Sequence, residues 1–375
     1  MDTTADRAGK TQPGARAEDS ARTRRILILG ASYGSLLATK LVLARHAVEM
    51  VCLPAEAELF NREGAVVRMP VKGRDAQVEV RTAHAAGRLS ATSPAEARPS
   101  GHDLVVLAMQ EPQYRQPGVR ELLAAVGRAR VPCMSIMNMP PLPYLKRIPG
   151  LDVDALRAAY TDPAVWDPID PALLTLCSPD PQAYRPPQEQ LNVLQVRLAT
   201  NFKAARFESN GHTALLRELE ADIQAVRFDA GGGTPIELPV KLKVHDSVFV
   251  PLAKWSMLLA GNYRCVQAGE MRSIKEAVHG DIEQTRAVYE WVSDLCVELG
   301  ADRADMVPFE KYAGAARSLE SPSSAARALA AGARDIERVD RLVQLIAAQR
   351  GKRLTVLDET VARVDGWLAA NRRKA

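Results

Sequence analysis

Long apolar runs are missing from this sequence. A helix needs about 20 mostly apolar residues to cross a bilayer, and no such run occurs among the 375 residues. Residues 1–23 are polar, rich in Ala, Arg, Thr and Asp, and lack the apolar centre of a secretory signal. We therefore expect a cytoplasmic protein without membrane association, in which residues 1–23 form a disordered tail.

Clusters of metal-binding or disulfide-forming residues are also missing. The five cysteines lie far apart and form no CxxC pair, and the six histidines show no ligand spacing. This pattern predicts reduced, structural thiols in a reducing compartment, and no metal site. The cysteines are Cys52, Cys133, Cys177, Cys265 and Cys296.

A strong charge of one sign is absent as well. The net charge of +4 is spread along the chain, and the one dense basic cluster before residue 30 is short. Nucleic acid is therefore not an expected partner. With 47% hydrophobic and 25% charged residues the composition is that of a globular protein. A chain of 375 residues exceeds one ordinary core, so two domains are expected.

The first clear pattern is a βαβ unit. Residues 24–29 (RRILIL) form an apolar run typical of a strand buried on both faces. A glycine-bearing turn, GASYGS, follows at 30–35, then helical spacing at 35–47 and a second apolar run at 48–53. Residues 102–109 and 131–138 read as two further buried strands with a helix between them. This alternation predicts an open, doubly wound α/β sheet.

The remaining patterns set the domain limits. Residues 140–190 are rich in proline and non-periodic, which indicates an insertion or lid, and alternation within 191–208 predicts a strand pair that closes the first domain. From about residue 237 the spacing of apolar residues is helical. We expect a Rossmann-type domain over 24–236 and an all-helical domain over 237–375.

The turn after the first strand carries the chemistry. Free N–H groups and the positive dipole end at a helix N-terminus favour a diphosphate, provided that small residues let the backbone approach it. A glycine there is also common as a plain tight connection. The stretch Leu53-Pro54-Ala55-Glu56 after the second strand matches neither an NAD nor an NADP signature. The expected cofactor-binding residues of the turn are Gly30, Ser32, Tyr33, Gly34 and Ser35.

Five segments resemble those of one enzyme family. They are the turn at Gly30 and the stretches 103–114, 135–141, 251–265 and 321–340. Together they resemble the ketopantoate reductase family over most of residues 25–350. The resemblance implies a Rossmann-type domain followed by a helical domain with the plan of 6-phosphogluconate dehydrogenases. It also implies that Gln110 approaches the cofactor and that Asn138 lies beside the nicotinamide and substrate, although Met139-Pro140 replaces the glycines of the family.

The catalytic lysine of the family has an offset counterpart here. Alignment on Trp255 puts Met257 in the lysine position, and Lys254 lies next door. Reduction of a ketone needs a proton donor and positive charge near the developing alkoxide, which a lysine supplies. We therefore assign this role to Lys254, whose other reading is an exposed helix lysine. Lys241 and Lys243 are reserve candidates.

The resemblance also implies a set of substrate residues. Asn262 follows Lys254 by about two helical turns. Ser323 and Ser324 match the serine of the family, and each is explained equally well as a helix N-cap. Asp335 corresponds to the family's acidic residue, and its other reading is a solvated helix face with Arg334 and Arg338.

We expect an oxidoreductase that uses NADP, with NAD as an option, to reduce a small 2-keto acid between its two domains. By resemblance the substrate is ketopantoate-like and the role lies in pantothenate biosynthesis, with a homodimer as the assembly. One alternative is an opine dehydrogenase with the same two-domain plan. Another is a dinucleotide-binding sensor without catalysis, which Met257 in the lysine position favours.

Overall fold

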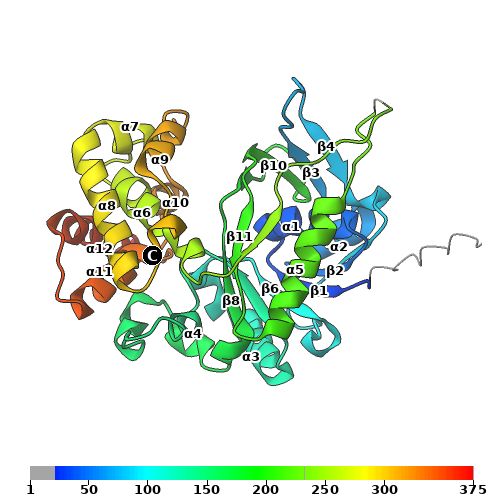
Figure 1. Cartoon of the computed structure of the whole chain (residues 1–375), viewed down its shortest axis with the longest axis horizontal. Coiled ribbons are helices and arrows are strands. Elements are labelled where there is room, and N and C mark those ends of the chain that lie inside the picture. The colour runs from blue at the N-terminus through cyan, green and yellow to red at the C-terminus, as the bar shows by residue number, and fades with distance from the viewer. Residues whose placement is uncertain (1–21, 232, 375) are drawn as a thin grey trace, which may run out of the picture.

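A computed structural model of the chain describes residues 22–231 and 233–374 (Figure 1). The tail expected at residues 1–23 lies outside the described part, except for its last two residues. The described chain forms an α/β region, followed by a helical region beside it. Within the described ranges, no helix is both long and apolar enough to cross a membrane.

An eight-stranded sheet forms the centre of the α/β region. Its order is β12-β11-β8-β7-β6-β1-β2-β5, and all neighbours are parallel except β8 and β11. The chain runs from β1 outward to β2 and β5 and then returns to β6 on the other side of β1, where open α/β sheets bind ligands. The strands are β1 (Arg25–Leu29), β2 (Ala47–Val51), β5 (Arg88–Thr92), β6 (Leu104–Leu107), β7 (Cys133–Ile136), β8 (Leu174–Ser178), β11 (Phe202–Ala205) and β12 (Leu242–His245).

Two hydrophobic cores cover the two faces of this sheet. Ile26 and Ile28 of β1 pack with α1 and α5, whereas Leu27 and Leu29 pack on the opposite face with α3. Burial on both faces explains why the first strand reads as a continuous apolar run. The strands predicted at 24–29, 48–53, 102–109 and 131–138 correspond to β1, β2, β6 and β7. The helices are α1 (Ala31–Leu43), α2 (Pro54–Glu63), α3 (Pro117–Ala129) and α5 (Asn210–Ala225).

A second, four-stranded sheet lies against α1. Its order is β4-β3-β10-β9, made of β3 (Val66–Met69), β4 (Val78–Arg81), β9 (Gln182–Tyr184) and β10 (Val193–Leu198). The prediction that two strands within 191–208 pair with each other is therefore wrong. Both strands form, but β10 joins this sheet while β11 joins the large one. Alternation indicates that a strand exists, but it does not say which strand lies beside it.

The proline-rich segment 140–190 is not simply an insertion. It begins with a short helix, α4 (Leu142–Leu145), and continues through 3-10 turns to β8, which is fully buried between β7 and β11. This central strand was not predicted, because prolines flank the apolar stretch 173–177 on both sides and made the segment resemble a loop. The segment thus completes the large sheet.

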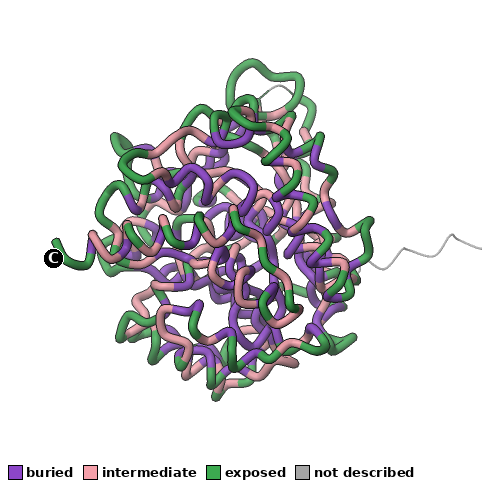
Figure 2. The backbone as a smooth tube through the Cα atoms, turned by 90° about the vertical axis from the view of Figure 1, so that its left-hand side faces the viewer, coloured by how far each residue is buried: buried purple, intermediate pink, exposed green. Residues whose placement is uncertain are grey.

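The helical region begins after β12, a strand that lies beyond the domain boundary expected at 236. One hydrophobic core continues from the large sheet into this region and includes Leu29, Trp255 and Val364. Figure 2 shows buried backbone running through the middle of the molecule. All five cysteines are free and buried. The helices are α6 (Lys254–Met257), α7 (Ile274–His279), α8 (Ile282–Glu298), α9 (Phe309–Ala316), α10 (Ser324–Ala330), α11 (Val339–Gln349) and α12 (Thr355–Arg373), with a π-helical turn at Leu258–Asn262.

Candidate active site

The turn between β1 and α1 is closely packed around two glycines. Gly30 has a φ of 105°, and a Cβ there would lie 2.7 Å from the carbonyl oxygen of Ala108. A Cβ on Gly34 would lie 2.6 Å from Cγ2 of Ile28, so Gly34 lets the helix approach the strand. The first turn of a helix has N–H groups without intrahelical acceptors, and no side chain caps α1. The turn therefore offers backbone donors to an anion.

The other residues of the turn have different surroundings. Ser32 is exposed, and its carbonyl oxygen accepts a hydrogen bond of 2.9 Å from the Ser35 hydroxyl. The Tyr33 hydroxyl donates to the carbonyl oxygen of Pro179 at 3.3 Å, and burial raises the pKa of this tyrosine. Tyr33 thus connects the turn to the chain segment that follows β8.

The end of β2 holds an ion pair that the sequence analysis did not predict. Arg185, which follows β9, pairs through Nη1 with Glu56 in the first turn of α2. Its Nη2 atom is buried and has no partner among the described residues. Leu53, between β2 and α2, is 69% exposed. In Rossmann-type folds the adenosine ribose of the cofactor lies at this position.

Lys254 extends from α6 to the end of β8. Its Nζ atom donates to the carbonyl oxygen of Pro179 at 2.5 Å and lies 3.8 Å from Oδ1 of Asp180. Oδ2 of Asp180 is paired with Lys203 on β11 at 3.0 Å. Burial lowers the pKa of Lys254, while Asp180 and Glu337 act in the opposite direction. The helical region thus presents one partly buried cation beside the dinucleotide turn.

Asn138 and Glu337 meet where β7 ends. The Asn138 side chain donates from Nδ2 to Oε2 of Glu337 at 3.3 Å, and its Oδ1 is buried without a partner among the described residues. The backbone N–H of Glu111, which follows β6, donates to Oε1 of Glu337 at 3.4 Å. The Glu111 carboxylate accepts hydrogen bonds from the backbone and hydroxyl of Thr161 at 3.0 and 2.8 Å. The Glu337 carboxyl group therefore contacts the residues that follow both of the neighbouring strands β6 and β7.

The extended backbone at 334–338 brings Glu337 to this place. The helix α10 ends before Gly332, whose φ of 90° is the left-handed conformation common after a helix. The helix α11 starts at Val339. Between them, the carbonyl oxygen of Glu337 accepts a hydrogen bond of 2.5 Å from the buried Tyr263 hydroxyl. This contact holds the segment against the helical region.

Burial changes the protonation of the two carboxyl groups. Burial raises the pKa of Glu337 to about 7, opposed by the Asn138 hydrogen bond and the charge of Lys254. Burial also raises the pKa of Glu111. Near neutral pH, Glu337 can therefore either donate or accept a proton, a property typical of catalytic carboxyl groups.

The structure places several predicted residues elsewhere. Asp335 forms ion pairs with Arg115 and Arg372 and does not join Asn138, where Glu337 takes the place expected for an acidic residue. Gln110 is exposed. Lys241 and Lys243, the reserve lysines, pair with Glu237 and Glu220.

The serines and Asn262 are not part of the contacts around Lys254. Ser323 is the N-cap of α10, since its hydroxyl accepts from the backbone of Ala326, and it donates to the carbonyl oxygen of Asn262 at 2.7 Å. Ser324 is exposed. The side chain of Asn262 is partly buried, and no hydrogen bond to it occurs among the described residues. Sequence reasoning missed Glu337, although an acidic residue between Ile336 and Val339 was a signal for it.

No protein-family model and no curated protein matches the chain. Solved structures do match. The 2-dehydropantoate 2-reductase from Methylococcus capsulatus has a TM-score of 0.62 at 13% identity, covering 92% of this chain and 97% of that one. D-mandelate dehydrogenase in complex with NADH and anilino(oxo)acetate has a TM-score of 0.60 at 12% identity, with 93% and 99% covered. A dimeric ketopantoate reductase from Staphylococcus aureus has a TM-score of 0.56 at 8% identity, with 92% and 99% covered.

The chain has the ketopantoate reductase fold. The α/β region with a parallel-dominated sheet and the helical region after it are both part of this likeness, which covers nearly the whole chain. In this chain, the ketopantoate reductase fold brings Lys254, Asn138 and Glu337 to the contact between sheet and helical region. A nicotinamide dinucleotide fits the residues present, because the glycine turn leaves room for its diphosphate and buried polar atoms of Asn138 and Arg185 lack partners.

Proposed function

We propose that the protein is an NAD(P)H-dependent oxidoreductase that reduces a small 2-keto acid to the 2-hydroxy acid. The observation that carries the proposal is the position of Lys254: it shares the carbonyl oxygen of Pro179 with Tyr33 of the β1–α1 turn, and its charge acts on Glu337, the partner of Asn138. Lys254, Asn138 and Glu337 come from three distant parts of the sequence. Carbonyl reduction needs a proton donor and positive charge near the developing alkoxide, which Lys254 can supply, and polar groups such as Asn138 and Glu337 can orient the substrate.

Lys254 acts as the proton donor in this proposal. A bound reduced nicotinamide supplies the hydride to the carbonyl carbon of the substrate. Lys254 stabilises the negative charge that develops on the carbonyl oxygen and then transfers a proton from Nζ to it, so that the ketone becomes a hydroxyl group. Burial lowers the pKa of Lys254, which makes the ammonium group a better acid than an exposed lysine.

Asn138 and Glu337 orient the substrate. The Asn138 amide is held from one side by Glu337, which leaves its buried Oδ1 available as an acceptor. The Glu337 carboxyl group, with a pKa raised to about 7, can bind the hydroxyl oxygen or hydrogen of the product. A polar group that is buried without a partner favours ligands that supply one.

The cofactor in this proposal is NADPH. Arg185 supports NADPH over NADH. Its buried Nη2 atom is a hydrogen-bond donor without a partner among the described residues, and it lies near the end of β2. Both oxygens of Glu56 are already engaged, one with Arg185 and the other with the backbone N–H of Leu53 at 3.1 Å. A free guanidinium donor at this position matches the 2′-phosphate of NADP.

The test is turnover of NADPH, followed by its absorbance, with a panel of 2-keto acids. We expect Lys254→Ala to lower kcat by about 100-fold or more, as loss of a general acid does, and to leave the Kd for NADPH within about twofold. Lys243→Ala is the matched control and should keep full activity. Lys243 lies on β12, the edge strand of the large sheet, and pairs with Glu220 of α5. An unchanged kcat in Lys254→Ala removes this residue from the mechanism.

The same panel separates the alternatives. Tight NADPH binding without turnover of any 2-keto acid would contradict the reductase and favour a sensor. Turnover that requires an amino acid together with the keto acid would identify an opine dehydrogenase. We also propose a homodimer, by analogy with the dimeric ketopantoate reductase of Staphylococcus aureus. Sedimentation at the mass of a single chain would contradict it.

A further inference from the structure

A pocket rich in arginine lies beside the candidate active site. It has a volume of about 550 Å³ and is formed by the end of the turn after β6, the segment 158–161, the segment 334–338 and helices α11 and α12. Lys254, Asn138 and Glu337 do not line it. Its arginines are Arg115, Arg334, Arg338, Arg341 and Arg372, and its acidic residues are Asp335 and Asp365.

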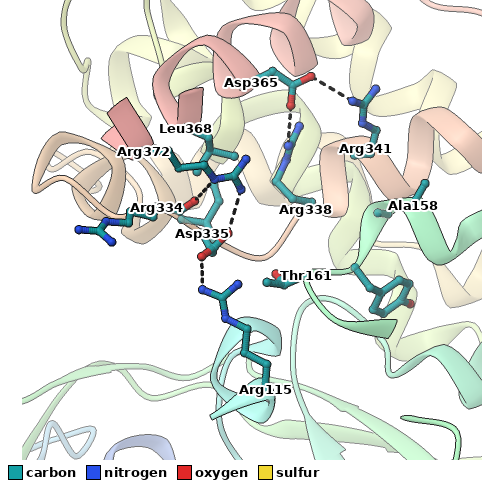
Figure 3. Close-up of a pocket in the computed structure, with 13 residues that line it drawn as sticks. Arg115, Ala158, Thr161, Arg334, Asp335, Arg338, Arg341, Asp365, Leu368 and Arg372 are labelled. Carbon is teal, nitrogen blue, oxygen red and sulfur yellow. Dashed lines mark hydrogen bonds and ion pairs between the residues drawn. The ribbon is translucent and has the colours of Figure 1, made fainter. Parts of the chain in front are cut away.

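Each acidic residue of the pocket is shared between two arginines. Figure 3 shows Asp335 between Arg115 and Arg372, which reach it from opposite sides. Asp365 in turn contacts Arg338 at 2.6 Å and Arg341 at 3.1 Å. Shared carboxylates therefore hold four guanidinium groups around one space.

Hydrogen-bond donors and positive charge exceed what these carboxylates can accept. A guanidinium group has five N–H donors, and Arg115 uses one atom, Nη2, for its contact with Asp335. Arg338 also pairs with Asp340, which is buried outside the pocket lining. Arg334 has no acidic partner in the described part of the chain. The five arginines of the pocket therefore share three carboxylates, two in the pocket and Asp340 outside its lining, and the excess positive charge favours an anionic ligand.

The arrangement matches phosphate better than a carboxylate. Arg115 comes from the α/β region, whereas Arg338, Arg341 and Arg372 come from the helical region on the other side of the pocket. Phosphate oxygens point in tetrahedral directions and accept from several sides, and arginine is the common partner of phosphate in proteins. The volume is within the range of small-molecule sites and larger than a single phosphate needs.

We propose that this pocket binds a small phosphorylated molecule that carries a diphosphate or two phosphate groups. The site is separate from the expected diphosphate site at the β1–α1 turn. One wall of the pocket is the segment 334–338, which also holds Glu337. A ligand bound here rests on the same short segment as the candidate catalytic carboxyl group.

The test is calorimetric titration of the full chain, saturated with NADPH, with inorganic pyrophosphate. We expect saturable binding that weakens with added salt. The double variant Arg341→Gln/Arg372→Gln should raise the Kd by at least about tenfold, since it removes two arginines that can make charge-assisted hydrogen bonds to the ligand. Arg286→Gln/Arg363→Gln is the matched control. It removes the same charge from partly exposed helix positions outside the pocket, and it should bind like the wild type.

Three results would overturn the proposal. One is the absence of saturable binding to the wild-type chain. Another is equal binding by Arg341→Gln/Arg372→Gln and wild type, which would place pyrophosphate elsewhere. The third is tighter binding of citrate than of pyrophosphate, which would reject the phosphate assignment. Should the double variant fail to fold, Arg115→Gln provides the same comparison from the α/β side, because that arginine is 42% exposed and lies outside both cores.

Discussion

At the scale of single residues, Arg185 is the proposed determinant of the choice between NADPH and NADH. It directly follows β9, a strand of the small sheet, and pairs with Glu56 in the first turn of α2, the helix after β2. We predict that Arg185→Gln weakens NADPH binding by about tenfold, the effect of one lost charge-assisted hydrogen bond, and changes NADH binding by less than about threefold. Fluorescence titration with both cofactors measures this. Arg197→Gln, which removes an arginine stacked on Tyr184 in the same sheet, is the control. Equal weakening of both cofactors would exclude a role in phosphate recognition.

Glu337 should make stability depend on pH. Its pKa is raised to about 7 in the folded state, from an ordinary value of 4.5. Between these pH values the folded state binds more protons than the unfolded state, so the free energy of unfolding falls as pH rises. The loss of stability caused by ionising the buried Glu337 carboxyl group is absent below pH 4.5 and complete above pH 7.

We therefore predict that Glu337→Gln, which cannot ionise, is more stable than the wild type at pH 8.5 by about 3 kcal/mol. The difference should shrink toward pH 5. Thermal unfolding across this range measures it, with the exposed α12 residue Glu359→Gln as control. A constant difference across the range would show that Glu337 does not titrate there.

At the scale of elements, the π-helical turn at Leu258–Asn262 depends on one glycine. A Cβ on Gly261 would lie 1.9 Å from the Tyr312 hydroxyl oxygen, and the Tyr312 ring is stacked on Tyr289 in the core. The same hydroxyl donates to the carbonyl oxygen of Met257 at 3.1 Å. The turn that follows Lys254 is therefore packed directly against α9.

We predict that Gly261→Ala destabilises the protein by about 1–3 kcal/mol, as overpacking of a core does. Denaturant unfolding measures the change. Tyr312→Phe removes the clashing oxygen, so the double variant should recover part of the loss. Gly314→Ala in α9 is the control, because no atom lies within 4 Å of a Cβ there. Additive losses in the double variant would contradict this account.

At the scale of the whole molecule, the two regions share one core. The hydrophobic cluster that contains Leu27 and Leu107 of the large sheet also contains Trp255, Leu342 and Val364 of the helical region. Separation of the regions would expose both apolar surfaces to water. They should therefore unfold together.

We predict a single calorimetric transition with a van't Hoff enthalpy close to the calorimetric one. NADPH should raise the midpoint temperature of this single transition, because a ligand that binds the native state stabilises all parts of the chain that unfold together. Two resolved transitions, with NADPH shifting only one of them, would show that the regions unfold independently.

Elements with local patterns could be predicted from the amino-acid sequence alone. Strand β1, the glycine turn and α1 follow from an apolar run, small residues and helical spacing within about twenty residues. These elements could be predicted because burial and backbone conformation leave a period in the sequence. Lys254 was assigned through the resemblance to ketopantoate reductases, and its catalytic role stays a prediction; the structure places it at the end of β8, in contact with Pro179 and Asp180.

Contacts between residues far apart in the chain became visible only in the folded structure. Glu337 is 199 positions from its partner Asn138. Its neighbour Asp335 has the same charge but forms ion pairs in the arginine pocket. The partners of β10 and β11 were likewise set by the sheets they join. Contacts between distant segments depend on how their surfaces pack. Unlike a helix or a strand, such packing leaves no periodic pattern in the sequence.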